Sequence, residues 1–197
     1  MFGRKSVLAA FLVVFAPCVA FAQVPSASST AETPVRRDGV IFRDVAAQVS
    51  SYPRFTVFDD IQASVSQGIV TLYGKVTMPY KRDDIARRVT KVAGVTQVVN
   101  RIGVLPVSQF DDELRYSIAR AIYGNPSFWH YASMVNPPIH IVVENGHVIL
   151  TGVVNNDVEK ALARSLAAGF NAFSVDSELK TDAEARAERE KIRPAGE

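Results

Sequence analysis

The sequence predicts an α+β fold built from two small repeated modules. The pattern G-x-V-x-L-x-G-x-V occurs at 68–76 and again at 146–154, and its alternating apolar residues predict a half-buried strand. A helical apolar stripe precedes each copy, and a second stripe and a short apolar segment follow it. Such a repeat indicates duplicated units. We expect the order helix, strand, strand, helix, strand in each module, with a mixed three-stranded sheet and helices on one face.

The first 22 residues are expected to be a cleavable signal peptide. Two basic residues precede an uncharged apolar segment at 7–21, and A-F-A at 20–22 supplies the small residues of a cleavage site. Cys18 is the only cysteine, and Pro17 before it disfavours a lipoprotein site. Residues 23–37, rich in Ser, Thr, Ala and Pro, are expected to form a flexible linker. These features predict a periplasmic protein.

Residues 38–105 form the first predicted module. Asp38 is placed to cap its first helix, and the strand at 61–66 is expected to pair with the signature strand so that Val65 lies opposite Val70. A last strand within 95–104 follows a helix and can therefore pair in parallel. The second helix is expected to bury one stripe and then stop at a glycine: Ile85, Val89, Val92 and Gly94.

Residues 111–180 form the second predicted module. Its first helix and its hairpin lie further apart than those of the first module, because five residues are inserted within 129–138. The second helix presents Leu162 and Leu166, one residue out of step with the first module. The final strand is expected to contain Phe173, Val175 and Leu179. Residues 181–197 are expected to form a charged tail that is transiently helical.

Four glycines carry the repeated signature. Gly68 and Gly146 stand at two-residue turns, where a positive backbone angle is needed. Gly74 and Gly152 lie on the same strand face as the apolar residues, so we expect a helix to approach closely there.

The chain resembles tandem BON domains. The two signature hairpins carry the resemblance together with the segment from Gly94 to Ile102, G-V-T-Q-V-V-N-R-I, which matches the family's ending G-V-x-x-V-x-N-x followed by an apolar residue. The likeness covers 38–180. It implies a non-catalytic bacterial envelope protein, similar to osmotically induced periplasmic proteins, that binds phospholipid or other envelope components in stress protection or envelope maintenance.

The residues themselves predict no enzyme, metal site or cofactor. His140 and His147 are expected roughly 10 Å apart along the hairpin, too far to share one ion, and Glu144 beside His147 is expected to form a charge pair with it. The chain has no G-x-S-x-G elbow and no P-loop, and its paired aspartates are expected to cap helices or border strands. Nucleic acid is not an expected partner, because the mature chain is neutral and has no basic stripe with interleaved aromatics.

The two modules differ in charge. Residues 38–105 hold nine basic and six acidic residues, a balance of +3, whereas 111–180 hold five and eight, a balance of −3. This asymmetry either docks the modules together, directs the first module to an anionic surface, or reflects chance variation on solvated faces.

Two non-enzymatic functions remain open. The first is binding to an anionic phospholipid surface through aromatic and apolar residues of the insertion and a basic helix face. The candidate residues are Phe128, Trp129, Tyr131 and Met134 in the second module and Lys81, Arg82, Arg87, Arg88 and Lys91 in the first. The alternative for these residues is that Phe128 and Trp129 complete the core of their own module and that the basic residues form an ordinary solvated face.

The second open function is a scaffold that binds envelope proteins or assembles with itself. The outward face of the second hairpin carries Val142, Ile149 and Val153, where the first hairpin has polar residues. This apolar face needs a cover, which is either the other module or a partner chain. The oligomeric state is left open.

Overall fold

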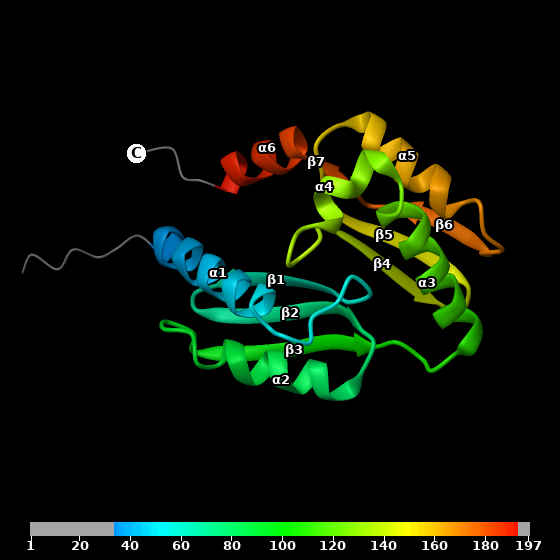
Figure 1. Cartoon of the computed structure of the whole chain (residues 1–197). Helices are drawn as coiled ribbons and strands as arrows, with labels where there is room; N and C mark the ends of the chain where they lie inside the picture. Colours follow the sequence, from blue (N-terminus) through cyan, green and yellow to red (C-terminus); the bar gives the residue numbers. More distant parts are fainter. Residues whose placement is uncertain (1–33, 193–197) are drawn as a thin grey trace, which may run out of the picture. The chain divides into compact units, whose positions relative to one another are not determined.

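The structure is a computed structural model that describes residues 34–192 (Figure 1). The expected signal peptide and most of the expected linker lie outside the described residues. The first helix, α1, spans Pro34–Ser50, so the last four residues of the expected linker are helical.

The first module has the predicted order of elements. After α1 come β1 (Asp60–Ser66), β2 (Ile69–Val76), α2 (Pro79–Val89) and β3 (Gln97–Val104). The strand order is β1-β2-β3, with β2 antiparallel to β1 and parallel to β3. This confirms the predicted mixed three-stranded sheet.

The hairpin of the first module has the predicted register, with Val65 opposite Val70. Both turn residues, Gln67 and Gly68, have positive φ angles of 52° and 76°, as a two-residue turn of this type requires. The role of Asp38 differs from the prediction. It lies inside α1, and its carboxylate accepts hydrogen bonds from the amides of Gln67 and Gly68 at 2.8 and 3.0 Å. This aspartate caps the hairpin turn instead of the helix.

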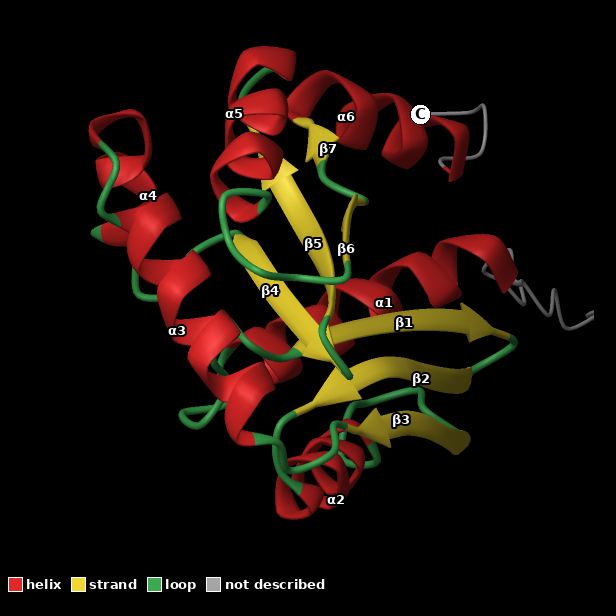
Figure 2. Ribbon diagram, turned by 90° about the vertical axis from the view of Figure 1, so that its right-hand side faces the viewer, coloured by secondary structure: helices red, strands yellow, loops and turns green. Residues whose placement is uncertain are grey.

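The core of the first module lies between the two helices and one face of the sheet. Figure 2 shows the ribbons of α1 and α2 beside the sheet of β1, β2 and β3. Buried residues of α1 and α2 pack with inward-facing residues of β2 and β3. The helix α2 ends at Val89, and Val92 is buried from the turn that follows. The predicted stripe is therefore buried, but its last member lies outside the helix.

The second module repeats this arrangement. Its elements are α3 (Gln109–Tyr123), the 3-10 turn η1 (Pro126–Phe128), α4 (Trp129–Ala132), β4 (Ile139–Glu144), β5 (His147–Val154), α5 (Asp157–Ala167), β6 (Ser174–Ser177), β7 (Lys180–Thr181) and α6 (Asp182–Ile192). The strands follow the order β4-β5-β6. The short strand β7 also pairs with β5 in parallel and continues the pairing of β6, since His147 lies opposite Ser174 and Val153 lies opposite Lys180. Asp111 of α3 accepts hydrogen bonds from the amides of Asn145 and Gly146, just as Asp38 does in the first hairpin.

The second helix of this module is in step with its counterpart. Ala163 and Ala167 are completely buried, and they occupy the positions that correspond to Ile85 and Val89 when the two signature hairpins are aligned. The leucines Leu162 and Leu166 are half-buried and pack beside the core. The displacement seen in the sequence arises because alanines occupy the central stripe of α5.

The predicted final strand is only partly correct. Val175 belongs to β6, whereas Phe173 precedes it and is exposed, and Leu179 is buried between β6 and β7. The strand is interrupted at Glu178 and Leu179, although the amide of Glu178 still donates to the carbonyl of Leu150 at 2.8 Å.

The expectation for Gly74 and Gly152 was wrong about the neighbour. A Cβ atom at Gly74 would lie 2.2 Å from the carbonyl oxygen of Asp60, and one at Gly152 would lie 1.8 Å from that of Pro138. Gly74 and Gly152 have φ angles of +115° and +116°. Because they lack a side chain, the backbone at the start of β1 and just before β4 can approach them closely. The close neighbour is therefore strand backbone and not a helix.

The two modules belong to one structural unit and contact each other. The amide of Ile141, on the edge strand β4, donates to the carbonyl of Val57 at 2.7 Å. Phe58 of the first module packs against the core of the second. Among residues 34–192, no helix combines the length and the apolar character needed to cross a bilayer.

Candidate functional site

The structure divides the predicted aromatic residues of the insertion into buried and exposed ones. Phe128 is completely buried and Tyr131 nearly so, and their rings stack with centroids 6.2 Å apart. Phe128 is the last residue of the short 3-10 turn that begins at Pro126, and its side chain belongs to the core of the second module. Phe128 and Tyr131 therefore belong to the core and cannot contact a membrane surface.

Trp129 and Met134 are the members of this set that reach solvent. The side chain of Trp129 is 62% exposed, and its indole N–H donates to the carbonyl of Gly124 at 3.3 Å, which fixes the orientation of the ring. Met134 is 47% exposed, and Val135 beside it is almost fully exposed. We call these three exposed apolar residues of the insertion, Trp129, Met134 and Val135, the insertion patch.

A hydrogen-bond network fixes the base of the insertion. The hydroxyl of Tyr131 donates to Glu159 at 2.7 Å and accepts from the amide of Asn155 at 2.9 Å. Burial and the bond to Glu159 raise the pKa of Tyr131 to about 12, so this phenol stays protonated. Burial alone would raise the pKa of Glu159, but the bonds from Tyr131 and Asn155 lower it below its ordinary value. The network holds the insertion against α5.

Lys81 is not part of a surface cluster. It is 4% exposed, and its Nζ lies 2.6 Å from the carboxylate of Asp59, which is completely buried. The amide and hydroxyl of Thr77 and those of Thr56 also donate to Asp59. Burial opposes the charge of Asp59, but these donors and Lys81 bring its pKa below the ordinary value. Lys81 therefore ties α2 to the loop before β1.

The other four basic residues of α2 and its C-terminal turn form a partly neutralised face. Arg82 pairs with Asp83 at 2.9 Å, and Arg87 pairs with Asp84. The guanidinium of Arg88 lies 5.5 Å from the ring centroid of Tyr52. With Lys91, this gives four basic and two acidic residues, a balance of +2, which we call the α2 face. Its attraction to anionic headgroups is correspondingly modest.

The sequence did not predict a third surface, at the turn of the second hairpin. Phe173 is 75% exposed and Phe110 is 43% exposed, with ring centroids 6.1 Å apart, and His147 lies 5.9 Å from Phe173. The rings lie over Gly146, where a Cβ would be 2.6 Å from Phe173. We call Phe110 and Phe173 the aromatic tip. The sequence signal for Phe173 was attributed to the final strand, which is why the tip was missed.

The apolar face of the second hairpin is partly covered by the first module. Val142 is only 5% exposed, whereas Ile149 and Val153 are half-buried. The neighbours of Val142 on this face both contact the first module: His140 lies beside Phe55, and Glu144 pairs with Lys75 at 2.9 Å. The expected pairing of Glu144 with His147 is replaced by this contact between modules.

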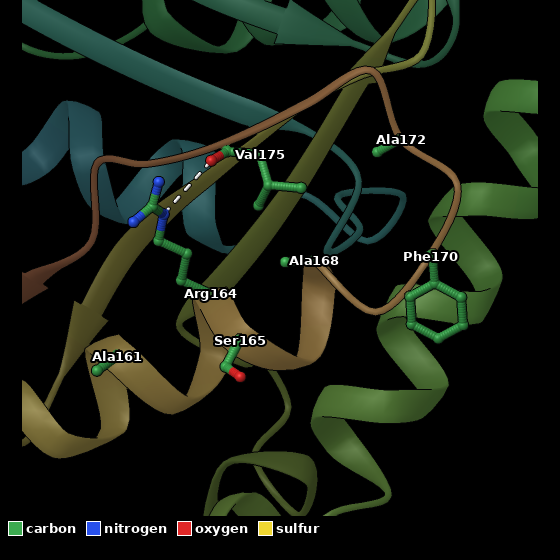
Figure 3. Close-up of a pocket in the computed structure, with 7 residues that line it drawn as sticks. All are labelled: Ala161, Arg164, Ser165, Ala168, Phe170, Ala172 and Val175. Atoms are coloured by element: carbon green, nitrogen blue, oxygen red, sulfur yellow. Dashed lines mark hydrogen bonds between the residues drawn. The ribbon is translucent and has the colours of Figure 1, made fainter.

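A shallow hollow of about 550 Å³ lies between α5 and the loop that follows it (Figure 3). Small side chains, including Ala161, Ser165 and Ala168, line it beside Arg164 and Phe170. The Nε of Arg164 donates to the carbonyl of Val175 at 3.4 Å, so the guanidinium is partly engaged by the backbone. The hollow contains none of the predicted site residues and no acid-base pair.

The described residues include no cluster of three or more His, Cys, Asp or Glu side chains arranged to bind a metal ion. The three histidines of the second module serve different contacts: His130 lies over Tyr131, His140 faces the first module, and His147 contacts Ser174.

The family model that matches this chain is the BON domain, over residues 37–106 and 130–183. The chain therefore belongs to the BON-domain family and contains two such domains. BON domains are non-catalytic and are associated with interaction with membranes and phospholipids. The second match begins after α3, although α3 contacts its hairpin turn through Asp111 in the way that α1 does through Asp38.

Among the solved structures that are similar to this chain are two with 16% sequence identity. Both are of CdsD, a structural protein of the type III secretion system of Chlamydia trachomatis. One match covers 80% of this chain and 70% of that chain, with a TM-score of 0.30. The other, to the C-terminal domain of CdsD, covers 72% and 65%, also with a TM-score of 0.30. No curated protein sequence matches this one.

Proposed function

We propose that this protein is a non-catalytic binding protein of the bacterial envelope that associates with the phospholipid surface from the periplasm, in envelope maintenance or stress protection. Membership of the BON-domain family supports the general association with membranes. The observation that carries the proposal for this chain is the insertion patch, in which Trp129 is held in an exposed orientation on a rigid base.

The insertion patch has the chemistry of an interfacial anchor. An indole ring combines a large apolar surface with one N–H donor, and such rings prefer the boundary between headgroups and acyl chains. Met134 and Val135, five and six residues further along the insertion, are also exposed apolar side chains. Because the Tyr131–Glu159 bond fixes the base of the insertion, binding requires little ordering of the loop, which favours affinity.

The α2 face supplies a weaker, charge-dependent contribution. Each basic residue close to an anionic surface contributes about 1 kcal/mol, and the two aspartates on the same helix offset part of this attraction. We therefore expect the fraction bound to increase with anionic lipid and to fall with salt, without depending on charge alone.

The test is co-sedimentation of the full chain with vesicles of phosphatidylcholine alone and with added phosphatidylglycerol. We expect Trp129→Ala to reduce the bound fraction several-fold on both vesicles, and Arg87→Gln with Lys91→Gln to reduce it only on the anionic ones. Val158→Ala, which changes an exposed apolar residue of α5, is the matched control and should bind normally. Equal binding by the wild type and both site variants would refute the proposal.

A second candidate function, docking of an envelope protein, is favoured by the aromatic tip. Its sequence neighbours Asp112, Glu113 and Asp176 are exposed acidic residues, which disfavour contact with an anionic membrane. In the same vesicle assay, Phe173→Ser should bind like the wild type if the tip contacts protein. A loss equal to that of Trp129→Ala would instead make the tip part of the lipid-binding surface.

A further inference from the structure

We propose that the contact between the two modules is an acid-sensitive latch, in which neutral His140 holds the second module on the first and its protonation releases the contact. This inference concerns the joining of the modules and does not depend on the proposed lipid binding.

His140 is placed at the centre of this contact. It lies on β4, opposite Thr151 of β5, and its ring centroid is 5.4 Å from that of Phe55 in the first module. The Nδ1 of His140 and the Oγ1 of Thr151 are both buried without a hydrogen-bond partner among the described residues. Burial of an imidazole without a partner for one nitrogen favours its neutral form over the charged one.

Charged groups around His140 oppose this effect only in part. Asp59 is paired with Lys81, and Glu144 on β4 is paired with Lys75 on β2. The register of the second sheet places His147, Asp176 and Lys180 on the same face as His140. In the first module, Arg54 precedes Phe55 and Asp60 begins β1. Burial lowers the pKa of His140, and the charges of Asp60 and Asp59 and the backbone of Thr56 and Asp59 limit this lowering.

The direction of the pH effect follows from this lowered pKa. When the modules separate, His140 becomes hydrated and recovers a pKa near its ordinary value of 6.5. The contact is therefore at full strength above that pH. As the pH falls below it, the separated form binds a proton more readily, and the equilibrium moves toward separation by up to about tenfold per pH unit until the pKa of the closed form is reached.

One backbone hydrogen bond reports on the latch directly. The amide of Ile141 donates to the carbonyl of Val57, so its partner is in the other module. Amides with partners inside one module serve as references, among them Thr96, which donates to Gly68, and Glu178, which donates to Leu150. Opening of the latch removes protection from Ile141 and leaves the references protected.

The experiment is amide hydrogen exchange of the full chain by NMR at pH 7.5, 6.0 and 5.0, with rates converted to protection factors. We expect the protection factor of Ile141 to fall by about tenfold or more between pH 7.5 and 5.0, while those of Thr96 and Glu178 change little. The imidazole of His140, followed in the same samples, should titrate over the range in which Ile141 loses protection.

Two variants separate the latch from general acid effects. His140→Gln removes the titrating group and should leave the protection of Ile141 independent of pH. His147→Gln removes an exposed histidine of the same hairpin and should behave like the wild type. Constant protection of Ile141 in the wild type, or the same acid-dependent loss in His140→Gln, would overturn the proposal.

Discussion

Lys81 and Glu159 show how one position serves the two modules with opposite charges. They occupy the same place in the second helix of each module when the signature hairpins are aligned. Lys81 binds Asp59 in the loop before β1, and Glu159 accepts a hydrogen bond from Tyr131 in the insertion before β4. In both modules a buried or half-buried polar contact ties the second helix to the segment that precedes the first strand.

We expect the loss of the ion pair between Lys81 and Asp59 to lower the stability of the folded protein strongly. Lys81→Met should lower the free energy of unfolding by about 3–5 kcal/mol, because it leaves a buried carboxylate without its counter-ion. Urea denaturation followed by circular dichroism measures this change. Arg82→Met, at a partly exposed position of the same helix, should change stability by less than about 0.5 kcal/mol.

The same ion pair should make the stability of the folded protein fall as the pH is lowered. Because the pKa of Asp59 is lowered in the folded state, its contribution is present above the ordinary value of 3.8 and is lost as the pH falls through the folded pKa. The loss of stability between pH 4 and pH 2 should therefore be smaller in Asp59→Asn with Lys81→Met than in the wild type. An equal loss in the two proteins would mean that other carboxylates dominate acid unfolding.

At the scale of the elements, the second strand of each hairpin contains a glycine whose missing side chain lets the backbone of the neighbouring segment lie close to it. Gly152 has a φ of +116°, and a Cβ there would lie 1.8 Å from the carbonyl oxygen of Pro138. Gly152→Ala should therefore destabilise the protein by more than the strain alone, which is about 1–3 kcal/mol. Thermal unfolding measures the effect.

Gly39 provides the matched control for that substitution. It lies inside α1, and a Cβ at this position would meet no heavy atom within 4 Å, so Gly39→Ala should stabilise the helix by about 0.5–1 kcal/mol. A destabilisation by Gly39→Ala, or none by Gly152→Ala, would contradict these assignments.

At the scale of the whole molecule, the two modules share apolar surface through Phe58. This residue comes from the first module, packs against the core of the second, and contacts Tyr116 edge to face at 5.3 Å. The opposite charge balance of the modules is also used locally, in the pair between Lys75 and Glu144. These contacts predict that the modules unfold together.

Removal of the Phe58 side chain should uncouple that unfolding. We expect Phe58→Ala to destabilise the protein by about 1–3 kcal/mol and to split a single calorimetric transition into two. Phe42→Ala, at an exposed position of α1, should keep one transition. Two transitions already present in the wild type would show that the modules are independent.

The sequence by itself determined the repeat, the order of elements and the register of both hairpins. These features follow from local chemistry: alternation selects strands, helical spacing selects amphipathic helices, and a two-residue turn with Gly68 or Gly146 sets which residues face each other. The same local rules left open whether Phe128 and Trp129 face a lipid surface or complete the core of their module, and spacing along the chain could not separate the buried Phe128 from the exposed Trp129.

Only the tertiary structure decided which side chains are exposed to solvent and which are buried in contacts with distant segments. Lys81 and Arg82 are adjacent and chemically alike, yet one is buried against Asp59 and the other is at the surface. Asp38 contacts a turn 29 residues away, and Phe58 of the first module packs against the core of the second. Exposure depends on which distant segment packs over a residue, and this information is absent from the spacing of residues along one element.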